Sequence, residues 1–109
     1  MPLIHKLDEF YRNIYLLGKQ IPKRDHFGIF LKIENVLLDV LELIITASLE
    51  TKINKISPLN SARIKIEILK RLIRLIQEFK IIEANKYLTL EKDLQEISKM
   101  INGWIKYLK

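Results

Sequence analysis

The chain has no cysteine, so it can form neither a disulfide nor a thiolate metal site. This composition fits a reducing compartment, and we expect a cytoplasmic protein. Three glycines and three prolines among 109 residues are few helix breakers. Their scarcity is typical of an all-α domain and disfavours an all-β fold.

Long uncharged runs are also absent. Asp39 and Glu42 interrupt the richest apolar segment, residues 36–49, whereas a membrane span needs about 20 largely uncharged residues. Asp8 and Glu9 stand where the apolar region of a signal peptide would lie. We therefore expect neither a membrane helix nor a signal peptide.

Residue patterns that carry catalysis are missing too. His5 and His26 are the only histidines, and neither belongs to the Glu-x-x-His pairs of carboxylate-bridged metal bundles. There is no glycine-rich phosphate loop, no G-x-S-x-G and no H-E-x-x-H. We predict a protein that is not an enzyme, with no catalytic residue, metal, cofactor or small-molecule substrate.

What the chain does contain is helical periodicity throughout. Apolar residues recur at spacings of three and four along the N-terminal segment. The last segment repeats with a period near 3.5, and the residues of its apolar seam are Tyr87, Leu90, Leu94, Ile97, Ile101, Trp104 and Leu108. Pro22 breaks the first pattern, and Ser57-Pro58 is a start signal for another helix. The sequence predicts one domain, residues 1–109, folded as an all-α, up-down-up-down antiparallel four-helix bundle. The helices are expected at about 3–19, 25–52, 58–80 and 84–108.

The positive charge is concentrated in one stretch, residues 52–74. This stretch carries seven basic residues and one acid, a net charge of +6 that equals the net charge of the whole chain. A local excess of this kind indicates an anionic partner. Within the predicted third helix, the best candidates for contact with that partner share one polar stripe: Arg63, Lys70, Arg71 and Arg74.

The same helix has an unusually wide apolar arc of about 200° at 100° per residue. A surface helix of a monomer needs an apolar stripe of only about 100°. Another subunit would cover the surplus. The alternative is a central helix flanked on both sides within its own bundle.

Three positions leave a choice open at this stage. Glu34 is expected among apolar positions of the second helix, where it would pair with a neighbouring Arg, Lys or Tyr or act as a general base. Gly28 marks either a close helix–helix approach or the fraying first turn of the second helix, and Gly103 marks either close packing or a tolerated glycine.

Three segments resemble a known family: Phe10-Tyr11 through Pro22-Lys23 to Ile33-Glu34-Asn35, the block Ile68 to Arg74, and Glu96 to Lys106 with its Gly103-Trp104-Ile105-Lys106. The chain resembles the accessory variability determinant (Avd) proteins of diversity-generating retroelements, which are related to bundle proteins encoded in intervening sequences of 23S ribosomal RNA genes. The resemblance implies a homopentameric barrel with a positively charged surface. It also implies binding to the retroelement reverse transcriptase and template RNA, in support of mutagenic cDNA synthesis. The family's basic pair falls on Lys70 and Arg74.

Other functions remain open from the residues alone. The basic stripe fits contact with nucleic-acid phosphates, but it also fits an acidic protein bound by an oligomeric adaptor, or a solvated face of an assembly scaffold. The resemblance likewise leaves open a protein of the ribosomal intervening-sequence type.

Overall fold

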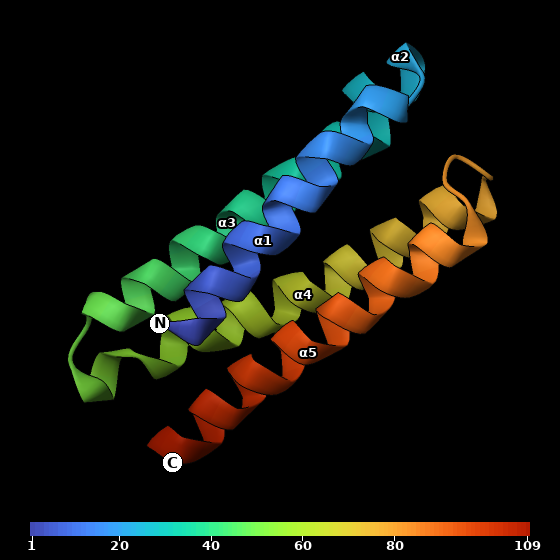
Figure 1. Cartoon of the computed structure of the whole chain (residues 1–109). Helices are drawn as coiled ribbons and strands as arrows, with labels where there is room; N and C mark the ends of the chain where they lie inside the picture. Colours follow the sequence, from blue (N-terminus) through green and yellow to red (C-terminus); the bar gives the residue numbers. More distant parts are fainter.

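All 109 residues are described by a computed structural model, and every regular element in it is helical. Four of the helices are long, and shorter segments join them (Figure 1). In chain order the elements are α1 (Pro2–Leu17), a 3-10 turn (Gly18–Gln20), α2 (Lys23–Asp25), a π turn (His26–Phe30), α3 (Leu31–Leu49), a 3-10 turn (Lys52–Asn54), α4 (Ile56–Glu78) and α5 (Ala84–Leu108).

The four long helices pack antiparallel in an elongated bundle of 43 × 22 × 20 Å. α3 packs most extensively on α4, α4 packs on α5, and α1 closes the bundle against α3 and α5. The predicted all-α antiparallel four-helix architecture is confirmed. None of the helices is both long enough and apolar enough to cross a membrane.

The core is entirely apolar. Twenty-five buried residues form one cluster, and no polar or charged residue is buried. The buried faces are largely the apolar faces that the periodicity predicts, because residues three and four apart share one side of a helix. In α5 the inner positions are Leu90, Leu94, Ile97, Ile101 and Ile105, whereas Trp104, which was predicted on the seam, is half-buried beside them.

The second predicted helix differs most from expectation. Instead of running unbroken from 25 to 52, it begins with the short α2, passes through the π turn and becomes regular only in α3. The interruption centres on Gly28, whose backbone angles (φ −104°, ψ −112°) are not helical. α3 then ends at Leu49, because Glu50 adopts an extended conformation.

The third predicted helix begins two residues earlier than Ser57-Pro58 indicated. α4 starts at Ile56, and no side chain caps it. The preceding 3-10 turn already holds Lys55 in helical geometry, so the chain enters the helix without a cap. Pro58 fits the first turn because backbone N–H groups there have no partner within the helix.

The end of α4 forms a Schellman motif. The N–H of Ile81 donates to the carbonyl of Ile76 (2.8 Å), and the N–H of Lys80 donates to the carbonyl of Gln77 (2.9 Å). Lys80 occupies the left-handed position of this motif with φ 60°, the only positive φ in the chain. The motif turns the chain sharply from α4 into α5.

The close helix approach lies at a glycine other than the two that the sequence singled out. A Cβ built on Gly18 would lie 3.0 Å from the Phe30 ring and 3.3 Å from Nε2 of His26, whereas one on Gly28 or Gly103 would meet nothing within 4 Å. Gly18 therefore lets the end of α1 pack against the π turn.

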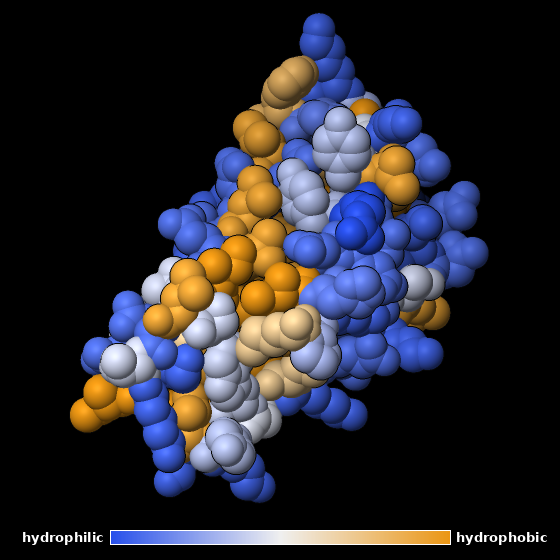
Figure 2. All heavy atoms as spheres, turned by 60° about the vertical axis from the view of Figure 1, so that its left-hand side comes forward, coloured by the Kyte–Doolittle hydropathy of each residue, from blue (hydrophilic) through white to orange (hydrophobic).

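Two sets of partly or largely exposed apolar side chains lie along the outer faces of α3 and α4. The α3 patch consists of Leu31, Leu38 and Ile45, and Figure 2 shows apolar residues running as a band along this face between hydrophilic borders. The α4 patch consists of Ile64, Ile68, Leu75 and Phe79, of which Leu75 is half-buried. The surplus in the predicted apolar arc of this helix is thus exposed in the single chain.

Candidate nucleic-acid interface

Lys70, Arg71 and Arg74 lie on the flank of α4 that faces α5. The opposite flank faces α3, because Nζ of Lys65 contacts Oδ2 of Asp39 on α3 at 3.3 Å. At 100° per residue, Lys70 and Arg74 point more than a quarter turn away from Lys65. The basic face is therefore formed by one edge of α4, and not every basic residue of 52–74 contributes to it.

An open groove of ≈ 250 Å³ runs between α4 and α5 beside these residues. It gathers three of the four predicted site residues, while Arg63 lies about two turns away along the same helix. The residues that line the groove are Glu67, Lys70, Arg71, Ile73, Arg74, Tyr87, Glu91 and Leu94.

Two of the basic residues have carboxylate partners on their own helix. Nζ of Lys70 lies 3.0 Å from Oε2 of Glu67, and Nε of Arg74 lies 3.2 Å from Oε1 of Glu78. The Arg74–Glu78 pair is the one that the i, i+4 spacing predicts, whereas Glu67 pairs with Lys70 in place of Arg71. Exposed pairs of this kind contribute about 0–1 kcal/mol, so an incoming anion can replace the carboxylate at small cost.

Arg63 and Arg71 carry uncompensated charge. Their side chains are exposed and take part in none of the chain's five ion pairs. Each guanidinium offers several N–H donors in a planar fork that matches phosphate oxygens. With Lys70 and Arg74 they form a positively charged edge whose donors face solvent.

Tyr87 is a groove residue that sequence reasoning missed, because its position in the apolar seam of α5 indicated a core side chain. It is half-buried and lines the groove together with Arg74. Burial raises the pKa of the Tyr87 phenol, and the Glu91 carboxylate raises it further. The phenol therefore keeps its proton at neutral pH and can donate a hydrogen bond to an anion in the groove.

Two of the three remaining lysines of the basic stretch, Lys55 and Lys65, serve the fold, whereas Lys52 is exposed in the turn before α4. Nζ of Lys55 donates to the carbonyls of Ala47 (2.7 Å) and Ser48 (3.4 Å) at the end of α3, and it lies 5.8 Å from the centre of the Trp104 ring. Lys65 joins α4 to α3, as described above. The charge excess in the sequence is thus divided between the exposed edge of α4, two structural contacts and the exposed Lys52.

Glu34 is not in the core. Its side chain is half-buried on α3 and makes no hydrogen bond or ion pair, so the predicted pairing with a neighbouring basic or tyrosine side chain is wrong. No group of three or more His, Cys, Asp or Glu side chains is arranged to hold a metal ion. The bundle also provides no hydrogen-bonded partner that would orient Glu34 as a general base.

Comparison with curated proteins gives no match. The model of the bAvd-like family, however, matches residues 1–108. The chain therefore belongs to the bAvd-like family, the bacterial accessory variability determinants of diversity-generating retroelements, whose members are generally non-catalytic accessory proteins.

Proposed function

We propose that this protein binds the template RNA and the reverse transcriptase of a diversity-generating retroelement, and thereby supports mutagenic cDNA synthesis. The observation that carries the proposal is the exposed basic edge of α4, formed by Arg63, Lys70, Arg71 and Arg74, in a chain of this family. An accessory protein without catalytic groups acts by holding the polymerase and its template together.

The chemistry of the basic edge favours phosphate over bases. Its donors are guanidinium and ammonium groups on one helix, which fit backbone phosphates and carry no sequence readout. No exposed aromatic side chain lines the groove beside it, so there is no platform on which bases would stack. RNA binding is therefore expected to be salt-sensitive and to depend little on sequence.

We further propose that the protein acts as a homopentameric ring. The α3 patch lies on the flank of α3 turned away from Asp39, whereas Ile68 of the α4 patch lies one turn from Lys65, on the flank that faces α3. The two patches thus occupy neighbouring sides of the bundle. Contact between the α3 patch of one copy and the α4 patch of the next is a head-to-tail interface, which closes into a ring when the rotation between copies fits.

A charge-reversal experiment tests RNA binding. The double variant Lys70→Glu/Arg74→Glu should weaken binding to template RNA by about tenfold or more at moderate salt. Each lost phosphate contact should also lower the slope of log Kd against log salt by about 0.7. The matched control is Lys23→Glu/Lys32→Glu, which makes the same change in net charge at exposed positions near the start of α2 and α3.

Unchanged RNA affinity in a folded Lys70→Glu/Arg74→Glu protein would refute the assignment of the basic edge. If the wild-type protein binds no RNA at physiological salt but does bind the polymerase, the adaptor function with an acidic protein partner replaces the proposal. Thermal unfolding followed by circular dichroism establishes that each variant keeps its fold.

A further inference from the structure

One end of the bundle carries the most exposed large apolar side chains of the molecule. The three most exposed large apolar side chains are Ile53 (86%), Leu49 (83%) and Tyr107 (82%). The turn between α3 and α4 and the last turn of α5 lie at this same end (Figure 1). Large side chains that stay this exposed mark sites of protein contact when they gather together.

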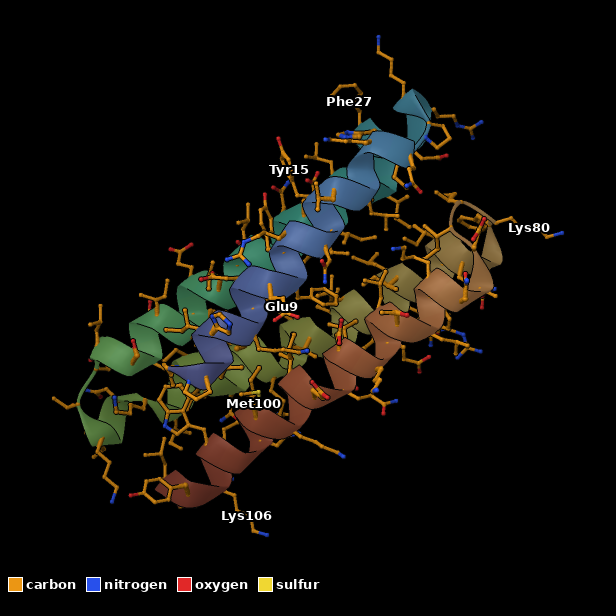
Figure 3. All side chains as sticks on the ribbon, viewed as in Figure 1. Glu9, Tyr15, Phe27, Lys80, Met100 and Lys106 are labelled. Carbon is orange, nitrogen blue, oxygen red and sulfur yellow. The ribbon has the colours of Figure 1, made fainter.

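The same end is strongly basic. Residues 49–58 and 99–109 together hold the lysines Lys52, Lys55, Lys99, Lys106 and Lys109 but only one acid, Glu50. Lys106 projects from the end of α5 away from the bundle (Figure 3). A partner that covers the apolar side chains must therefore bring negative charge around them.

Internal contacts hold this surface in shape. Lys55 ties the α3–α4 turn to the last carbonyls of α3 and lies over the ring of Trp104. Within the turn, Nδ2 of Asn54 donates to Oγ1 of Thr51 at 3.0 Å. Ile53 is thus presented by a tethered 3-10 turn, and little ordering entropy is lost when a partner covers it.

The composition of this end differs from that of the α4 edge. The α4 edge offers arginines paired or interspersed with glutamates, whereas this end offers lysines around aliphatic and aromatic tips. Phosphate contacts need only the charged groups, but buried apolar and aromatic anchors are what protein interfaces rely on. Two surfaces of different chemistry suit two different partners.

We propose that the lysine-rich end of the bundle, centred on Ile53 and Tyr107, docks an acidic surface of the reverse transcriptase that has apolar recesses. The α4 edge is thereby left free for RNA. This inference rests on the proposed function, since it divides the two partners between two surfaces. Leu49 lies close to the α3 patch along the helix, so a substitution there would also affect the proposed ring contact. Substitutions at Ile53 and Tyr107 test polymerase docking without touching that patch.

Single substitutions at these exposed tips test the inference with the full-length protein and the purified retroelement polymerase. Ile53→Asp and Tyr107→Asp should each weaken polymerase binding by about tenfold or more, since each removes an apolar anchor and adds charge repulsion. The RNA affinity and the assembly mass by light scattering should stay at wild-type values. The matched control is Leu88→Asp, at a side chain 62% exposed near the opposite end of the bundle.

The outcomes separate the two proposals. Polymerase binding equal to wild type in Ile53→Asp and Tyr107→Asp overturns the docking surface while the proposed function stands. A parallel loss of RNA binding in these variants assigns this end to RNA and also overturns it. A wild-type protein that binds no polymerase refutes the polymerase part of the proposed function and this inference with it.

Discussion

Gly18 is the position where a single added methyl group has the clearest consequence. Its own backbone angles are ordinary for a helix, so alanine meets no conformational penalty there. The added Cβ would instead lie 3.0 Å from the ring of Phe30, which is fully buried. The cost of Gly18→Ala is thus a packing cost, and it tests the contact between the end of α1 and the π turn.

We expect Gly18→Ala to lower the free energy of unfolding by about 1–2 kcal/mol, because overpacking outweighs the gain in helix propensity. Gly103→Ala is the internal control, since its Cβ would meet nothing within 4 Å in the last third of α5. This second change should raise stability by up to about 1 kcal/mol. Urea unfolding of both variants measures the effects, and a stabilised Gly18→Ala would show that the contact is loose.

Lys6 is the residue at which pH should act on stability. Its Nζ lies 3.1 Å from Oδ1 of Asp93 and 3.1 Å from Oε2 of Glu96, which joins α1 to α5. The contact with Glu96 raises the pKa of Lys6, partly opposed by burial and reinforced by Asp93. The same contact lowers the pKa of Glu96.

The sign of each shift sets the pH window. The Glu96 contribution is present above the ordinary pKa of 4.5 and is lost as the pH falls through the lowered pKa of the folded state. The Lys6 contribution is present below 10.5 and is lost as the pH rises through the raised pKa. We therefore expect Lys6→Met to be less stable than wild type at neutral pH, with the difference shrinking in strong acid. A difference that is constant from pH 2 to pH 7 would exclude this linkage.

Among the elements, the end of α4 holds the one residue with a strained backbone conformation. Lys80 adopts a left-handed conformation that costs an L-residue about 1–2 kcal/mol and costs glycine nothing. Lys80→Gly should raise the free energy of unfolding by about 0.5–1 kcal/mol, because part of this relief is offset by the greater freedom of glycine in the unfolded chain. Lys80→Ala removes the same side chain but keeps the strain, and it should show no gain in thermal unfolding.

The periodicity of the sequence was enough to predict the elements but not their ends. Four helices and an apolar core follow from spacings of three and four, because burial of one face decides a helix. The start of α4 depends on a turn that already holds Lys55 in helical geometry, and the π turn depends on how His26 and Phe30 pack around Gly18. Contacts between distant residues of this kind leave no local pattern in a sequence.

The candidate site was predictable only in part for the same reason. The charge excess in residues 52–74 pointed to α4, and the angular positions of its residues around the helix axis indicated which edge is exposed. That Tyr87 would line a groove beside Arg74, and that Lys65 would turn to Asp39, depends on how α4 meets its neighbours. Helix–helix orientation is set by packing across the bundle, which one helix alone does not encode.

For the whole molecule, the two apolar patches allow a test of how copies assemble. Leu38→Asp removes the α3 patch, and Ile68→Asp removes the α4 patch. In a head-to-tail ring, each variant alone keeps one patch without a complementary one, so each should be a monomer of 13.0 kDa. An equimolar mixture should form a capped dimer of twice that mass, measured by light scattering. Variants that still form rings, or a mixture that stays monomeric, would refute the head-to-tail interface.

The two ion pairs on the basic edge have a consequence for which RNAs are retained. Glu67 and Glu78 are tethered next to Lys70 and Arg74, so they compete with any phosphate at a high local concentration. A short oligonucleotide reaches only one subunit, so it meets this competition without contacts to a second subunit. A long strand that crosses several subunits of the proposed ring gains from each contact already made. The protein would then select RNAs by length. In a titration with oligonucleotides of increasing length, the affinity should rise steeply once an oligonucleotide spans neighbouring subunits. An affinity that does not change with length would show that each copy binds alone.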